Sequence, residues 1–217
     1  MPDLSFRITG VHSGSRGLTP LLHFKLEVTN SPPAESIHTI MLQAQIQIQA
    51  PQRTYVASEK EKLEDLFGTP DRWGQTLRNR LWTHASTCVR SFEGTIEAQL
   101  PVTCTYDLNV GATKYFYALE NGEVPLLFLF SGTIFYAGAG GQLQVQQIPW
   151  DKECSYRMPI KVWQMLMDHH YPGMAWISLR RDIFDRLYAY KRQHGFAGWD
   201  QAIEQLLPAS ENAEVAS

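Results

Sequence analysis

The stretch that decides the fold is residues 124–150, VPLLFLFSGTIFYAGAGGQLQVQQIPW. It contains the densest apolar run of the chain, residues 125–130, followed directly by β-branched and aromatic residues. Such a run is typical of a strand buried on both faces or of a buried helix segment, and the β-rich composition with flanking glycines favours the strand. The glycines at 138–141 supply a hairpin turn, so residues 142–148 are expected to return as the partner strand. We predict that this hairpin is the centre of a sheet and that Phe128 and Phe130 are buried.

Strict alternation of apolar and polar residues marks further strands, because successive side chains of a strand point to opposite faces. The pattern occurs in five other segments, at residues 4–8, 22–28, 40–48, 92–100 and 106–112. In the third segment and the residue that follows it, isoleucine, leucine and alanine alternate with four glutamines at 43, 45, 47 and 49, which predicts one buried and one solvent-facing side. Together these strands predict a mainly β (α+β) fold, an antiparallel β-sandwich of roughly eight strands.

Two parts of the chain have helical periodicity instead. Residues 58–82 are predicted to form a helical insertion, because Ser58 and Glu61 have the spacing of a capping box, and Trp73, Leu77 and Leu81 recur four apart. From residue 158 to 207 the apolar residues again follow helical spacing. We therefore expect a β-sandwich domain over residues 1–157 with the insertion at 58–82, C-terminal helices at 158–207 packed on the same domain, and a disordered tail at 208–217.

Composition and charge restrict the classes of partner. The 217 residues are 44% hydrophobic with a net charge of −3, so a real core is expected and nothing favours nucleic acid or an anionic membrane. No apolar stretch approaches the ~18 residues of a membrane-spanning helix, and no secretory signal is visible at the N-terminus. Three widely spaced cysteines argue against a disulfide framework. These features predict a cytoplasmic protein.

The residues that could carry chemistry do not form a recognisable catalytic or metal motif. His84 and Cys88 are four apart, a spacing that metal ligands use on helices, but no second paired ligand accompanies them. Ser131 lacks the G-x-S-x-G context of a hydrolase nucleophile, and the glycines at 138–141 join two strands rather than a strand and a helix. We therefore expect no metal, no cofactor and no catalytic residues.

Partner binding is the function class that the sequence favours, because large aromatics exceed what one core face needs. Trp82 and Trp150 stand where predicted elements end, and such junctions often carry contacts. The candidate binding residues are Trp82, His84, Tyr106, Trp150 and Asp151. The alternative is an enzyme, or a protein that handles a small molecule or a metal, with a pocket near Trp82, His84, Tyr106 and Trp150.

Several motifs resemble an uncharacterised bacterial family, a domain of unknown function. They are LFGTPDRWGQTLRNRLWTH at 66–84, CTYD at 104–107, KYF at 114–116, PLLFLFSGTIFYA at 125–137 and IPWDKE at 148–153. The resemblance extends over almost the whole chain and carries no assigned catalytic residues. Members of that family occur beside nickel–iron hydrogenase structural and maturation genes. The resemblance therefore implies a non-catalytic accessory or assembly protein that binds another protein, such as a hydrogenase subunit or maturation factor.

Overall fold

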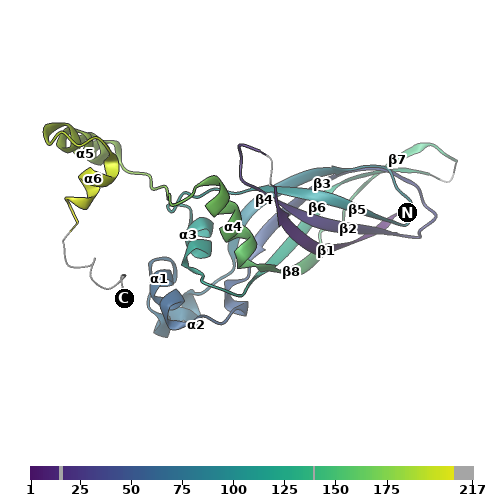
Figure 1. Ribbon diagram of the computed structural model, residues 1–217. Helices are drawn as coiled ribbons and strands as arrows, with labels where there is room; N and C mark the ends of the chain where they lie inside the picture. Colours follow the sequence, from purple (N-terminus) through teal and green to yellow (C-terminus); the bar gives the residue numbers. More distant parts are fainter. Residues whose placement is uncertain (15–16, 139, 208–217) are drawn as a thin grey trace. The chain divides into compact units, whose positions relative to one another are not determined.

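The chain is arranged as two compact units, Met1–Trp176 and Ile177–Ser217. The computed structural model describes residues 1–14, 17–138 and 140–207, and the strands all lie in the first unit (Figure 1). Each unit is described by itself below.

A three-stranded antiparallel sheet is formed by β1 (Asp3–Ser13), β2 (Leu21–Ser31) and β5 (Thr95–Thr103), in the order β1-β2-β5. Its inward residues follow the predicted alternation, since Leu4, Phe6, Phe24 and Leu26 are buried while their neighbours on β1 and β2 face outward. The alternation at residues 4–8, 22–28 and 92–100 thus correctly predicted β1, β2 and β5, because one face of each strand meets the core.

A five-stranded antiparallel sheet contains the predicted hairpin. Its members are β3 (Ile37–Ile48), β4 (Arg80–Val89), β6 (Glu123–Ala137), β7 (Leu143–Gln147) and β8 (Glu153–Pro159), with the path β4-β3-β6-β7 and β8 also paired to β6. On one edge of β6, β8 pairs with residues 123–129 and β7 with residues 133–137. The predicted hairpin is confirmed as β6 and β7, and β6 is the central strand. The hairpin is not the centre of the sheet, however, because β7 lies at its edge and the central pair is β3 and β6.

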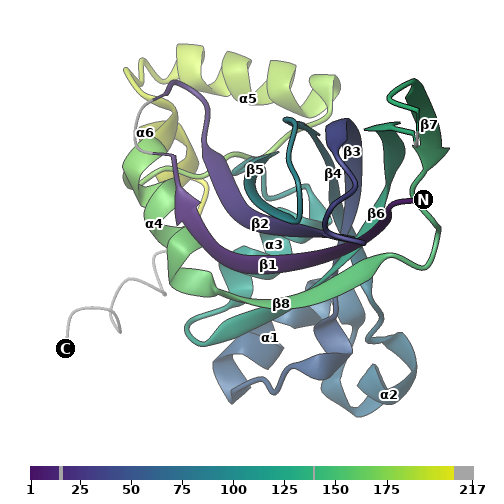
Figure 2. The same cartoon turned by 90° about the vertical axis from the view of Figure 1, so that its right-hand side faces the viewer.

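The two sheets face each other and form the predicted sandwich. The Phe6 and Phe130 rings stack at 4.4 Å, and Phe24 meets Phe128 edge-on at 5.2 Å. Phe128 and Phe130 are 0% and 2% exposed, which confirms their predicted burial. Strand β4 lies beside β5 and β1 beside β8, so the sheets approach each other along both edges (Figure 2).

The helical insertion begins and ends earlier than predicted. It comprises η1 (Ala50–Gln52), α1 (Ala57–Phe67), η2 (Pro70–Arg72) and α2 (Trp73–Thr76), and β4 begins at Arg80, so Leu81 lies on a strand and not on a helix. The predicted capping residues were also wrong. Glu59 and not Glu61 accepts the backbone N–H at the start of α1, with Glu59 Oε2 3.2 Å from the amide nitrogen of Val56.

Two further elements differ from the prediction. The predicted strand at residues 106–112 is a loop that leads into α3 (Gly111–Ala118), where Ala112, Tyr115 and Phe116 are buried at helical spacing. Strand β8, which the alternation did not single out, follows Trp150, and the first C-terminal helix, α4, spans Ile160–His170. Helix α4 belongs to the first compact unit.

The second unit contains α5 (Arg181–Gln193) and α6 (Trp199–Glu204). Its aromatic rings contact one another, with Trp199 5.4 Å from Phe184 and 6.0 Å from Tyr188. The predicted packing of all C-terminal helices on a single domain stays a prediction, and the predicted tail at 208–217 lies outside the described residues.

Candidate functional site

The two outward faces of the sandwich differ in charge. On the three-stranded sheet, charged side chains lie across the strands: Arg7 forms an ion pair with Glu27 at 2.7 Å, and Lys25 and Glu97 are also exposed or partly exposed. Rows of this kind are typical of a solvated sheet surface.

On the five-stranded sheet, the part of the outward face formed by β3, β4, β6 and β7 carries large apolar side chains in place of those charges. We call this surface the sheet face, and we define it by cross-strand rows. Its members are Thr39, Met41, Gln43 and Gln45 on β3, His84, Ser86 and Cys88 on β4, Leu129, Ser131, Thr133 and Phe135 on β6, and Val145 and Gln147 on β7. Met41 is 61% exposed and Val145 57% exposed. None of these residues of β3, β4, β6 and β7 is an acid, a lysine or an arginine, and the exposed charges on this side of the sheet lie on β8, where Glu153 stands opposite Leu129.

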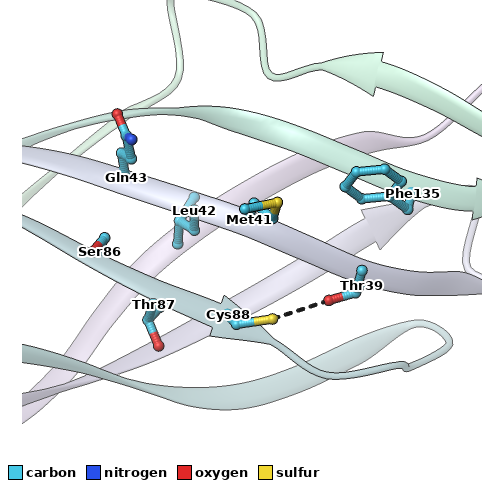
Figure 3. Close-up of a pocket in the computed structure, with 8 residues that line it drawn as sticks. All are labelled: Thr39, Met41, Leu42, Gln43, Ser86, Thr87, Cys88 and Phe135. Atoms are coloured by element: carbon cyan, nitrogen blue, oxygen red, sulfur yellow. Dashed lines mark hydrogen bonds between the residues drawn. The ribbon is translucent and has the colours of Figure 1, made fainter.

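A hollow of about 640 Å³ lies on the sheet face (Figure 3). Met41 and Phe135 supply its apolar surface, and Cys88 stands directly opposite Met41 on the neighbouring strand. The Thr39 hydroxyl donates to the carbonyl oxygen of Val89 at 2.9 Å, so its 3.2 Å contact with Cys88 is one in which the thiol donates. The hollow therefore combines apolar surface with small uncharged polar groups and opens widely to solvent.

Gly132 allows the strands beneath this hollow to approach closely. Its φ is +139°, and a Cβ built there would lie 2.0 Å from the carbonyl oxygen of Met41. Only glycine fits such a position without displacement of the backbone. The sequence motif FSG therefore has a local reason: Ser131 faces outward and Gly132 sits against β3.

The structure places three of the five predicted binding residues at the sheet face or its border. His84 lies on β4 opposite Gln45. Trp150 and Asp151 lie in the turn between β7 and β8, which is fixed to β6 at both ends: Ile148 N–H donates to Gly132 O at 2.9 Å, and Phe130 N–H donates to Lys152 O at 2.8 Å. Trp150 is 93% exposed.

The other two predicted residues lie in an interior aromatic cluster. Trp82 meets Phe116 of α3 at 4.9 Å, Phe116 meets Trp163 at 5.4 Å, and Trp163 meets Tyr106 at 5.8 Å. Burial raises the pKa of Tyr106. The structure thus separates the five residues into two places, and the residues that line the hollow at Met41 are different ones.

His84 and Cys88 are arranged differently from the helical metal spacing considered above. Both lie on strand β4 with their side chains on one face, where four residues span roughly 13 Å. Within residues 1–14, 17–138 and 140–207, no group of three or more His, Cys, Asp or Glu side chains could hold a metal ion. Among the same residues, no helix is both long and apolar enough to cross a membrane.

A second hollow, of about 610 Å³, lies beside a buried ion pair. Arg53 Nη2 is 2.6 Å from Glu59 Oε1, and the two side chains are only 8% and 3% exposed. Arg53 also donates to the carbonyl oxygens of Asn121 and Glu123, and Glu59 accepts the N–H of Glu120. All these partners lie within the protein, so the Arg53–Glu59 ion pair holds the loop after α3 against α1.

The comparison with family models agrees with the motifs noted in the sequence, because one model matches residues 1–215. The chain belongs to a family of unknown function, DUF6084. This member of the family is also similar to a crystal structure described as "Putative ApaA Protein from Bordetella pertussis", with 12% identity and a TM-score of 0.27 over 73% of this chain and 95% of that one. No curated protein matches this chain.

The sequence did not single out the apolar residues of the sheet face in this family member. Met41 interrupts the glutamine row of β3 on its polar side, and that interruption was the available signal. Met41 indicates an apolar surface only when the strands beside β3 are known, because Phe135 and Val145 reach the same surface from β6 and β7.

Proposed function

We propose that this protein is a non-catalytic accessory protein that binds another protein through its sheet face. The observation that carries the proposal is the contrast between the two outward faces of one sandwich. One bears charged side chains and cross-strand ion pairing, while the other exposes Met41 and Val145 among uncharged neighbours. Depletion of charge around exposed apolar side chains is typical of the centre of a protein–protein interface.

The shape of the surface supports a protein partner more than a small molecule. Pockets for small molecules enclose most of the ligand, whereas the hollow at Met41 opens widely on a sheet surface. Trp150, an exposed aromatic at the border of this surface, has the character of an interface anchor. The family resemblance noted from the sequence makes a nickel–iron hydrogenase subunit or maturation factor the first partner to test.

The test compares capture of partner proteins by the full chain and by charge-insertion variants. Met41→Glu and Val145→Glu place a carboxylate in the sheet face, and Gln99→Glu places one on the exposed side of β5 in the other sheet. Tagged chains would capture proteins from the native organism, and the partner identified would then be titrated as a purified protein. We expect Met41→Glu and Val145→Glu to weaken binding about tenfold or more, since a desolvated charge at an interface costs more than about 1.4 kcal/mol.

Gln99→Glu is the matched control and should bind as the unaltered chain does. Thermal melting of each variant establishes that the fold is retained, because all three substituted side chains face outward. The proposal is wrong if the folded Met41→Glu and Val145→Glu variants both retain full affinity for every captured partner. Trp150→Ala extends the test to the border of the surface and should weaken the same complex.

A further inference from the structure

The second unit leaves most of its apolar surface uncovered. Among its described residues, 177–207, Ala202 is buried and the rest are at least partly exposed. Phe184 and Tyr188 on α5 are 44% and 49% exposed. A two-helix segment of this length gains little stability from its own core, so a face of this kind is expected to be covered by another surface.

The exposed aromatics lie on a stripe of α5 that is symmetric about one residue. Relative to Tyr188, Phe184 and Asp185 lie four and three positions before, and Lys191 and Arg192 lie three and four positions after. Residues at these spacings share one face of an α-helix. The stripe therefore carries an acidic residue on one side of its centre and basic residues on the other.

The flank of the stripe that bears Asp185 and Arg192 is open. On the opposite flank, the Trp199 ring of α6 lies 5.4 Å from Phe184 and 6.0 Å from Tyr188, and the Lys191 ammonium lies 5.6 Å from the centre of the Trp199 ring. Asp185 and Arg192 are both exposed, and neither forms an ion pair with another described residue of its own chain. Two opposite charges seven residues apart are too distant to pair within one helix, because seven residues span about 10.5 Å.

We propose that α5 pairs antiparallel with α5 of a second copy of this chain, about a twofold axis at Tyr188. The axis brings the two Tyr188 rings together and sets Asp185 of each copy beside Arg192 of the other, which forms two equivalent ion pairs. An isologous interface requires a self-complementary surface, and the charge order along this stripe provides one. The interface is distinct from the sheet face and does not depend on the function proposed for that surface.

The charges of the second unit, as well as its exposed apolar area, indicate which partner covers the stripe. The described residues 177–207 contain five arginine or lysine residues and four aspartate or glutamate residues. A helix that lies on an anionic membrane is typically rich in Lys and Arg along its polar face, whereas Asp182 and Asp185 lie on α5 between its arginines. Alternating charge of this kind favours another helix with the same pattern.

The test is the oligomeric state of the full chain, measured by sedimentation equilibrium over a range of concentrations. The unaltered chain should show a reversible monomer–dimer equilibrium. Asp185→Arg places two arginines opposite each other across the axis, and Arg192→Asp does the same with two aspartates. Each variant alone should dimerise at least tenfold more weakly. An equimolar mixture of the two variants should regain dimerisation, because both arginines of one chain then face aspartates of the other.

A matched control lies on the opposite side of the same helix. Arg186→Asp repeats the charge change of Arg192→Asp away from the stripe and should leave the equilibrium unchanged. Circular dichroism reports whether each variant keeps its helices, and recovery in the mixture excludes misfolding as the cause of the loss. A monomeric unaltered chain at every concentration overturns the proposal and assigns the stripe to the first unit of the same chain, to another protein or to a membrane. Failure of the mixture to recover while each single variant is impaired also overturns it.

Discussion

Removal of the Glu59 carboxylate should destabilise the protein far more than removal of an exposed acid. In Glu59→Ala, the guanidinium of Arg53 would remain buried without its 2.6 Å partner, and the N–H groups of Glu120 and Val56 would lose their acceptor. Breaking a buried pair by removing one partner costs about 3–5 kcal/mol. In a chain of this size that loss lowers the melting temperature by roughly 10 °C.

Urea unfolding followed by tryptophan fluorescence measures this free energy, and Glu27→Ala is the matched comparison. Glu27 pairs with Arg7 at 2.7 Å, but their side chains are 32% and 69% exposed, so the loss should stay below about 1 kcal/mol. A double variant, Arg53→Met with Glu59→Leu, should be less destabilised than Glu59→Ala because no unpaired charge remains. Equal free energies of unfolding for Glu59→Ala and Glu27→Ala would refute the assignment of Arg53 and Glu59 as a buried ion pair that stabilises the fold.

Three further outcomes are expected from the packing of the sandwich. Phe128→Ala should lower the free energy of unfolding by about 3–5 kcal/mol, because its ring is fully buried against Phe24; an unchanged urea midpoint would contradict this. Gly132→Ala should destabilise the fold and alter the sheet face, since its Cβ would lie 2.0 Å from Met41 O; a melting temperature equal to that of the unaltered chain would show that β6 adjusts freely. Burial raises the pKa of Tyr55 to about 12, so the stability that it contributes is fully present below about pH 10, its ordinary pKa, and is lost as the pH rises towards 12. Urea unfolding at about pH 9 and about pH 11, on either side of that ordinary pKa, should therefore show a smaller difference for Tyr55→Phe than for the unaltered chain, and an equal difference would rule out this role.

The strands with one buried face were predictable from the sequence because alternation records which face meets the core. The segments 4–8 and 22–28 show it without interruption, 40–48 shows it except at Met41, and all three are strands. Residues 106–112 show the same alternation but lead into a helix, because Ala112, Tyr115 and Phe116 also have helical spacing. A short segment that fits both periods is decided by tertiary contacts, which the sequence pattern does not contain.

The candidate site was less predictable than the fold. Trp82 was expected at a surface junction, yet its ring packs between Phe24 and Phe116 because the strand that carries it begins at Arg80. The insertion was predicted to continue as a helix to residue 82, and that error also misplaced Trp82. Met41 became recognisable only through its neighbours across the sheet, since a single strand does not reveal which residues lie beside it.

Strand β6 changes neighbours at Gly132, and this gives its two halves unequal resistance to opening. Residues 126–129 lie between β3 and β8, whereas residues 133–136 lie between β3 and the five-residue strand β7. The amide hydrogens of β7 can therefore exchange with solvent when β7 opens locally, while the pairing of β6 with β8 stays intact. The sheet face includes residues on both sides of Gly132, so a protein bound there would contact both halves of β6. Such binding would slow amide exchange in β7 without any change in the path of the chain.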